Sequence, residues 1–156
     1  MTPQCLVDQL KVQKHFFDRS TACLLEEHAC FAPVEGVMTA AQTVAHVAHT
    51  VDWFIEGAFR PEGFNLDFEG MAREIEHIKT MAEAREWLDR AYAAAIAKIG
   101  ACSMDDLQQP MADGPVMGGM PRLAIVGAMA DHAAHHRGAL TIYSRLCGLT
   151  PEMPYG

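Results

Sequence analysis

Three histidines lie within five positions of the segment DHAAHHRGAL, residues 131–140. His132 and His136 are four residues apart, so on a helix their side chains lie on one face with β-carbons about 5–6 Å apart. At that separation two imidazoles can reach one metal ion, each about 2.0–2.1 Å from it. The spacing alone is weak evidence, because a chain with 8 histidines can contain such a pair by chance.

An apolar row along the predicted helix contains both of these histidines. Its members recur at steps of three or four residues: Ile125, Met129, His132, His136, Leu140 and Tyr143. A buried imidazole that lacks a partner costs about 1–3 kcal/mol. Two imidazoles on one inward row therefore favour a metal site, and a hydrogen-bonded pair of core histidines is the alternative. His135 lies about 100° away from the row and is predicted to be solvated.

A third ligand must come from another helix, and the segment AQTVAHVAHTVDWF supplies two candidates, His46 and His49. On a wheel of about 100° per residue, His46 lies closer to the edge of the apolar arc, on the side that carries Thr50 and Trp53. We therefore predict that His46 faces a pocket and that His49 lies at its rim or on the surface. The remaining histidines have no partner at ligand spacing and are predicted to lie in solvent: His15, His28 and His77.

Other catalytic patterns are missing from the sequence. Ala133 occupies the position at which an H-E-x-x-H zinc protease carries its glutamate base. There is no G-x-S-x-G motif, and no Gly-rich phosphate loop follows a strand. The segment GPVMGGMP, residues 114–121, is interpreted as a flexible turn that precedes a helix.

Composition and charge exclude several classes of partner. The net charge is −8 and the 12 lysines and arginines form no basic run, which argues against nucleic acid. Five cysteines without a C-x-x-C motif favour a reducing compartment. The N-terminal segment has no apolar signal-peptide region, and no stretch approaches the ~20 apolar residues that span a bilayer. We predict a cytoplasmic protein with no membrane partner.

Four predicted helices must position the histidines, over residues 2–30, 39–59, 80–100 and 121–147. Capping residues or prolines mark their starts: Thr2 with Pro3, Thr39, Thr80 and Pro121. Strand content should be negligible, apart from a short extended piece near Val116. Four helices of comparable length bury their apolar stripes best as a bundle.

The predicted fold class is therefore all-α, a four-helix bundle forming a single domain over residues 1–156. The connections at 60–79 and 100–120, between the second and third and between the third and fourth helices, are long for such a bundle. Long connections often carry function or cover a site.

The C-terminal segment DHAAHHRGALTIYSRLCGLTPEMPYG resembles the signature of DinB/YfiT-like proteins, in which H-x-x-x-H-R-G precedes a Leu-x-Gly turn and a Pro-rich tail. The matching residues are His132, His136, Arg137, Gly138, Leu146, Gly148, Pro151, Pro154, Tyr155 and Gly156. The segment TVAHVAHTVDWF is similar to the second helix of that family, whose Ala-His pair carries over to His46. The likeness spans essentially the whole chain. One position departs from it, because Ala139 stands where the family commonly has glutamine.

The resemblance implies an up-down-down-up four-helix bundle, frequent dimers, and a divalent-metal site formed by His46, His132 and His136. Characterised members of the family include thiol-dependent S-transferases and a maleylpyruvate isomerase. Ala139 puts a direct transfer of any relative's activity in doubt. We accordingly expect a homodimer, a small-molecule substrate and a low-molecular-weight thiol as partners.

Three neutral histidines with an open position describe a catalytic type of site, because structural zinc sites normally have four protein ligands. All-nitrogen ligation suits zinc or nickel better than magnesium or calcium. Two reactions are open: attack by a thiolate on an electrophile, and hydrolysis by activated water. The motif contains no carboxylate base, which favours the thiol transferase over the hydrolase. A metal-binding or stress-responsive bundle without turnover is the third reading.

Three further residues are assigned provisional roles around the site. Arg137 follows a ligand but points off the inward row, so we predict a salt bridge to a neighbouring helix, with a contact to an anionic substrate as the alternative. Trp53 and Tyr143 either line the pocket or pack in the aromatic core.

Overall fold

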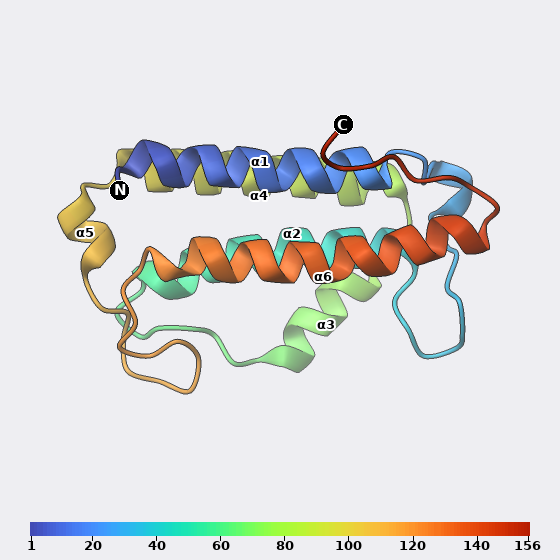
Figure 1. The fold of residues 1–156 in the computed structure, drawn as a ribbon. Helices are drawn as coiled ribbons and strands as arrows, with labels where there is room; N and C mark the ends of the chain where they lie inside the picture. The colour runs from blue at the N-terminus through green and yellow to red at the C-terminus, as the bar shows by residue number, and fades with distance from the viewer.

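The chain forms four long helices and two short ones, with no sheet (Figure 1). The computed structural model describes residues 1–156. The long helices are α1 (Pro3–Thr21), α2 (Ala40–Phe59), α4 (Met81–Ala101) and α6 (Ala124–Leu146). The short ones are α3 (Phe68–Glu76) and α5 (Met104–Gln108), and a 3₁₀ turn covers Glu26–His28. The all-α prediction is confirmed. The one extended pairing is an isolated bridge between Pro110 and Pro121, whereas Val116 lies in a turn.

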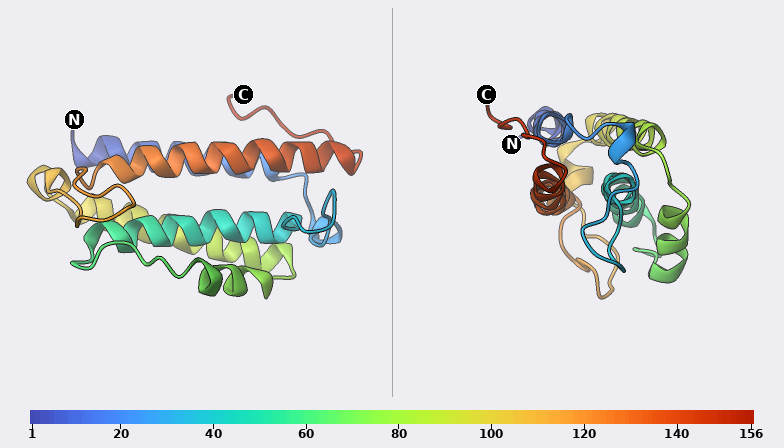
Figure 2. Two further views of the ribbon diagram at one scale, coloured as in Figure 1. Left: turned by 90° about the horizontal axis from the view of Figure 1, so that it is seen from below. Right: turned by 90° about the vertical axis from the view of Figure 1, so that its right-hand side faces the viewer.

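The long helices stand at the corners of a square, seen end-on in the right-hand view of Figure 2. Both α1 and α2 pack against α4 and α6. Helices α1 and α6 run in one direction and α2 and α4 in the other, which is the expected up-down-down-up order (Figure 1). Because the neighbours α2 and α4 are parallel, the chain must return along the bundle between them. A helix of 20 residues spans about 30 Å, so this connection has to be long.

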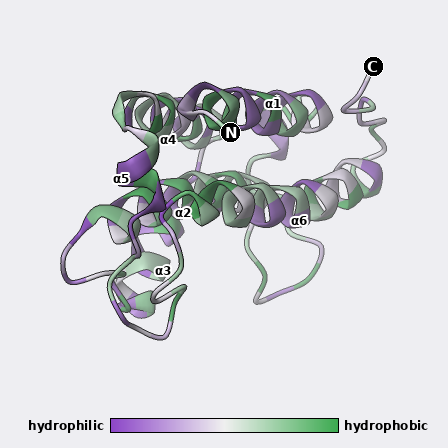
Figure 3. Ribbon diagram, turned by 60° about the vertical axis from the view of Figure 1, so that its left-hand side comes forward, coloured by the Kyte–Doolittle hydropathy of each residue, from purple (hydrophilic) through white to green (hydrophobic).

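The core lies between the four helices. Each long helix carries both hydrophobic and hydrophilic stretches, as Figure 3 shows, and the hydrophobic positions supply the buried residues. The largest fully buried side chains include one or more from every long helix: Leu10, Phe17, Val44, Leu88, Tyr92, Ile125 and Leu140. None of the helices is both long and apolar enough to cross a membrane.

Helix α1 ends at Thr21, so the prediction that it continues to Cys30 was wrong. The Arg85 guanidinium, on α4, donates hydrogen bonds to the carbonyl oxygens of Thr21 and Leu24, at 2.7 and 3.2 Å. Two residues later the Glu26 carboxylate accepts from the backbone N–H groups of Met81 and Ala82, both at 3.1 Å. These bonds tie the end of α1 to the start of α4, where exposed helix-terminal groups need partners.

Helix α6 begins at Ala124, three residues after the predicted start at Pro121. The preceding residues form 3₁₀-type turns and also backbone hydrogen bonds with the end of α5. The Arg122 N–H donates to the carbonyl oxygen of Gln109 at 3.0 Å, and the Leu123 N–H donates to that of Leu107 at 2.9 Å. The connection at 102–123 is thereby fixed against the start of α6.

Helix α3 lies inside the connection 60–79 and was not predicted from the sequence. Asp67 caps its start by accepting a hydrogen bond from the Gly70 N–H at 2.9 Å. Earlier in the connection the Phe64 ring lies against Gly57 of α2, where an added β-carbon would be only 2.3 Å from the ring. Glycine at 57 therefore lets the connection pack closely, and α3 covers one side of α2.

Candidate metal centre

Three histidines from two antiparallel helices converge at one point of the bundle. His46 comes from α2, and His132 and His136 come from successive turns of α6. Their ring centroids are separated by 4.9 Å (His46–His132), 4.7 Å (His46–His136) and 4.5 Å (His132–His136). One nitrogen of each ring can be chosen so that all three lie within 4.8 Å of one another. Sequence analysis selected this set of residues, and the structure brings them together.

The donor set fits a divalent transition metal. The Nε2 atoms of His46 and His132 are 3.1 Å apart. Two nitrogens bound at about 2.0–2.1 Å with tetrahedral angles lie about 3.3 Å apart, so this pair needs little movement to accept an ion. Thr50 lies beside the pair: its hydroxyl donates to the backbone carbonyl oxygen of His46 at 2.8 Å, and its Oγ1 lies 3.4 Å from Nε2 of the His132 ring.

Burial keeps the three imidazoles in the neutral form that binds metals. Burial, with a smaller contribution from the neighbouring histidines, lowers the pKa of His132 to about 3 and that of His136 to about 4. The pKa of His46 is lowered mainly by burial as well, with His49 and His135 adding to the effect. Metal ligation requires unprotonated nitrogen, so no proton has to be displaced from an imidazolium at neutral pH.

In the metal-free protein we expect stability to fall as the pH is lowered from about 6.5 towards 4. Unfolded histidines take up protons near pH 6.5, whereas in the folded chain His132 and His136 do so only at about pH 3 and 4. The unfolded state binds more protons in this window, so the free energy of unfolding decreases with decreasing pH. Urea midpoints at pH 7.0 and 4.5 measure the effect.

The matched variants for this measurement are His132→Ala and His15→Ala. His15 is exposed, so its replacement should leave the pH dependence of the parent unchanged. The His132→Ala protein should lose less stability than the parent between the two pH values. If the parent, His132→Ala and His15→Ala all lost the same amount of stability between pH 7.0 and 4.5, the lowered pKa of His132 would be contradicted.

A cavity of about 440 Å³ opens onto the cluster. It lies between α2 and α3, and His46 and His132 form part of its wall. The rest of the lining is mostly apolar and includes Trp53, Phe68 and Met71. His46 and His132 thus border space that the side chains of α2 and α3 leave free. A small molecule in the cavity would therefore lie directly against two of the three rings.

The other histidines lie outside the cluster. His49 is half-buried at the edge of the cavity, with its ring 5.7 Å from that of Trp87, as a rim residue should be. His135, His15 and His77 are exposed, as predicted. His28 is not in solvent, contrary to prediction: it is half-buried, and its Nδ1 accepts a hydrogen bond from the Leu25 N–H at 3.1 Å.

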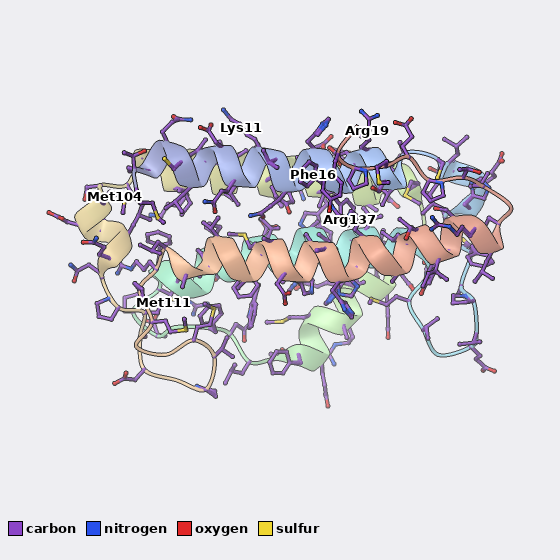
Figure 4. The ribbon with its side chains drawn as sticks, viewed as in Figure 1. Lys11, Phe16, Arg19, Met104, Met111 and Arg137 are labelled. Carbon is purple, nitrogen blue, oxygen red and sulfur yellow. The ribbon has the colours of Figure 1, made fainter.

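Arg137 makes no salt bridge, so that prediction was wrong. Its guanidinium lies 5.8 Å from the centre of the Phe16 ring on α1, and the two side chains are labelled together between α1 and α6 in Figure 4. Trp53 does line the cavity, and its indole N–H donates to the carbonyl oxygen of Asn65 at 2.7 Å. Tyr143 packs outside it against Phe31, and its hydroxyl donates to a backbone carbonyl.

The wall contributed by α3 was missed in the sequence, because residues 60–79 were interpreted as a loop. A signal was present there. Phe68, Met71 and Ile75 recur at steps of three and four, which is helical spacing, and Asp67 precedes them at a capping position. Gly70 and the short length of nine residues obscured this pattern.

A four-helix bundle in which α2 and α6 bring three histidines together beside a cavity defines a class of helical proteins equipped to bind a divalent metal. The sequence profile of the DinB superfamily matches residues 9–140. That is most of the chain, and this protein belongs to the DinB superfamily.

Solved structures agree on the fold. A DinB-like protein from Bacillus cereus ATCC 10987 superposes with a TM-score of 0.76 and 16% identity, over 97% of this chain and 96% of the other. A DinB-like protein from Bacillus subtilis, YjoA, superposes with a TM-score of 0.69 and 17% identity, over 96% of each chain. No curated protein matches the chain. At these identities the similarity establishes the fold and leaves the activity open.

Proposed function

We propose that the protein binds one divalent transition-metal ion through His46, His132 and His136 and acts as a thiol-dependent transferase on a small molecule. The observation that carries this proposal is the opening of the histidine cluster onto a cavity of about 440 Å³. A metal held only for structure would be enclosed by a fourth protein ligand. Three imidazole nitrogens support zinc or nickel as the ion.

When bound, a divalent ion supplies Lewis acidity that lowers the pKa of a thiol or of water. The residues of the chain do the rest. The histidines hold three neutral nitrogens at one point, and the mostly apolar wall between α2 and α3 borders the adjoining space. In the proposed reaction a thiol R–SH and an electrophile R′–X give R–S–R′ and HX. The S–C bond forms, the C–X bond breaks, X leaves with the bonding electrons, and the thiol proton passes to solvent.

A metal-dependent hydrolase is the second candidate, and Glu76 is the observation that supports it. Its side chain lines the same cavity as His46 and His132, so it is available as a general base for water. No carboxylate, however, forms a hydrogen bond with any ring of the cluster. Thiol transfer needs such a base less than hydrolysis does, and we therefore favour transfer. A bundle without turnover is the third candidate.

The test uses zinc-loaded and nickel-loaded protein with 1-chloro-2,4-dinitrobenzene, an uncharged electrophile with a chloride leaving group, in the presence and absence of cysteine or glutathione. We expect the protein to accelerate thioether formation only when both metal and thiol are present. Formation of dinitrophenol without thiol would instead indicate the hydrolase. Stoichiometric metal without either product, over a panel of electrophiles, would leave only the non-catalytic bundle.

The cavity wall, rather than the metal, is expected to set which compounds react. The proposal also places the protein in the reducing cytoplasm, where low-molecular-weight thiols are available and its five cysteines stay unpaired.

A further inference from the structure

We infer that the cavity between α2 and α3 is a binding site for an uncharged, apolar, aromatic-sized group, which is the part of the substrate that lies beside the metal centre. This inference rests on the proposed function only in assigning the bound group to the substrate. Binding of such a group is a property of the chain's own residues, because the wall is complete without a metal ion.

The wall of the cavity is built to contact an apolar surface. Trp53 and Phe54 of α2 face Phe68, Met71 and Ile75 of α3 across it. The single polar atom of the Trp53 ring is already used, since its indole N–H donates to the Asn65 carbonyl oxygen at 2.7 Å. The ring therefore offers the cavity only its apolar face. Aromatic rings bury a large apolar area and prefer other rings as partners, so an aromatic ligand gains most here.

Phe68 is the clearest sign that the wall lacks a partner. It stands at the first position of α3 on the margin of the cavity, and 58% of it is exposed to solvent. Its ring centre lies 6.3 Å from that of Trp53, at the outer limit of an aromatic contact. An exposed phenyl group that borders an apolar cavity is a typical element of a ligand site.

The charges of the chain's own side chains around the cavity disfavour an anionic group in the metal-free protein. No lysine or arginine lines it, and the one side chain there that carries a formal charge at neutral pH is Glu76. Sites for carboxylates and phosphates normally supply arginine or lysine, which form charge-assisted hydrogen bonds with them. A buried anion without such a partner pays a large desolvation cost.

A second hollow next to the cavity is also lined by negative charge. It measures about 230 Å³ and shares His49, Trp53 and Met71 with the apolar cavity. Four carboxylate residues line it without any lysine or arginine: Asp52, Glu56, Asp67 and Glu74. An anionic ligand that extended from one cavity into the other would meet repulsion throughout.

The size of the cavity agrees with a small organic molecule. Its volume of about 440 Å³ falls within the range of about 300–1,000 Å³ that is common for such sites. Ala72 of α3 also lines the cavity with a small side chain. A phenyl group at this position would occupy part of the space, whereas a change at the next residue, Arg73, would not, because Arg73 lies outside the lining.

The experiment compares two probes that differ in charge, 2-naphthylmethanol and 2-naphthoate, by isothermal titration calorimetry. The full chain is used after removal of metal, so that the carboxylate cannot bind through an ion. We expect the neutral probe to bind at one site and the anionic probe to bind at least tenfold more weakly. Equal or tighter binding of 2-naphthoate would overturn the inference.

Three variants locate the binding. Ala72→Phe should weaken binding of 2-naphthylmethanol at least tenfold, and Phe68→Ala should weaken it several-fold. The exposed position of Phe68 allows this change without loss of the fold. Arg73→Ala, on the same helix, should leave it unchanged. Circular dichroism checks that each variant is folded. Unchanged affinity in both Ala72→Phe and Phe68→Ala would show that the probe binds elsewhere and would overturn the inference.

The two proposals fail in distinguishable ways. If the chain binds no metal but 2-naphthylmethanol still binds and responds to Ala72→Phe, the metal-dependent function is wrong and the cavity inference stands. If metal binds stoichiometrically and the neutral probe does not bind, the cavity inference is wrong and the metal centre stands.

Discussion

Replacement of His132 by alanine is expected to remove almost all bound metal from the protein. The parent, purified without a histidine tag, should carry zinc or nickel near one ion per chain, and His132→Ala less than about a tenth of that. His132 contacts both other members of the cluster, because its Nε2 lies 3.1 Å from that of His46 and its ring is 4.5 Å from that of His136. Removal of a residue that hydrogen-bonds to a metal ligand already lowers metal affinity about 10–100-fold. Removal of a ligand itself should therefore lower metal affinity at least about 100-fold.

The matched control is His135→Ala. His135 lies on the same turn of α6 as His136, but it is exposed and is not part of the three-histidine set. Elemental analysis of the parent and both variants, with circular dichroism to confirm the fold, is the first measurement to make. Metal retained in His132→Ala, or absent from all three proteins, would refute the assigned ligands and would leave these histidines as a hydrogen-bonded core cluster.

Replacement of Phe17 by alanine should lower the free energy of unfolding by about 3–5 kcal/mol, a large share of the roughly 5–15 kcal/mol that stabilises a domain. Phe17 is fully buried in α1, which packs against α6, and it lines the same cavity as Ala130 and Ala133, on the segment of α6 that carries the candidate metal centre. The side chain therefore holds α6 in place from the side of α1. Chemical unfolding in urea measures the loss.

Val12→Ala is the control for this change, because Val12 is on the same helix and is 47% exposed. It should cost well under 1 kcal/mol. Zinc added at about 100 times its Kd should raise the free energy of unfolding of Phe17→Ala by about 2.7 kcal/mol. The reason is that an ion that binds only the folded state stabilises that state by mass action. A cost below 1 kcal/mol for Phe17→Ala would contradict its placement in the core.

The sequence was sufficient to predict helix starts and side-chain placement wherever the stabilising contacts join residues close along the chain. Thr39 and Gln42 form the expected capping box at the start of α2, because both hydrogen bonds join residues three apart. The pairing of His132 with His136 follows from the pitch of one helix. His46 could be separated from His49 for the same reason, since three residues turn a helix by about 60° relative to its starting face.

The helix boundaries that were wrong are those set by distant partners. The end of α1 depends on Arg85, which is 64 residues from Thr21 along the chain. The start of α6 depends on hydrogen bonds to residues 107 and 109 of the preceding connection. Propensity and capping patterns contain no information about such pairs, because they describe only neighbours along the chain.

The sequence by itself determined the class of fold, the long helices, and the three histidines that meet at the candidate metal centre, because periodicity and local capping encode these. Only the tertiary structure decided that α3 covers α2, that the cluster opens onto an apolar cavity, and that Arg137 contacts Phe16 instead of a carboxylate. Each of these depends on which surfaces face each other once the four helices are packed. That choice is made by burial of apolar area over the whole chain, and no local pattern records it.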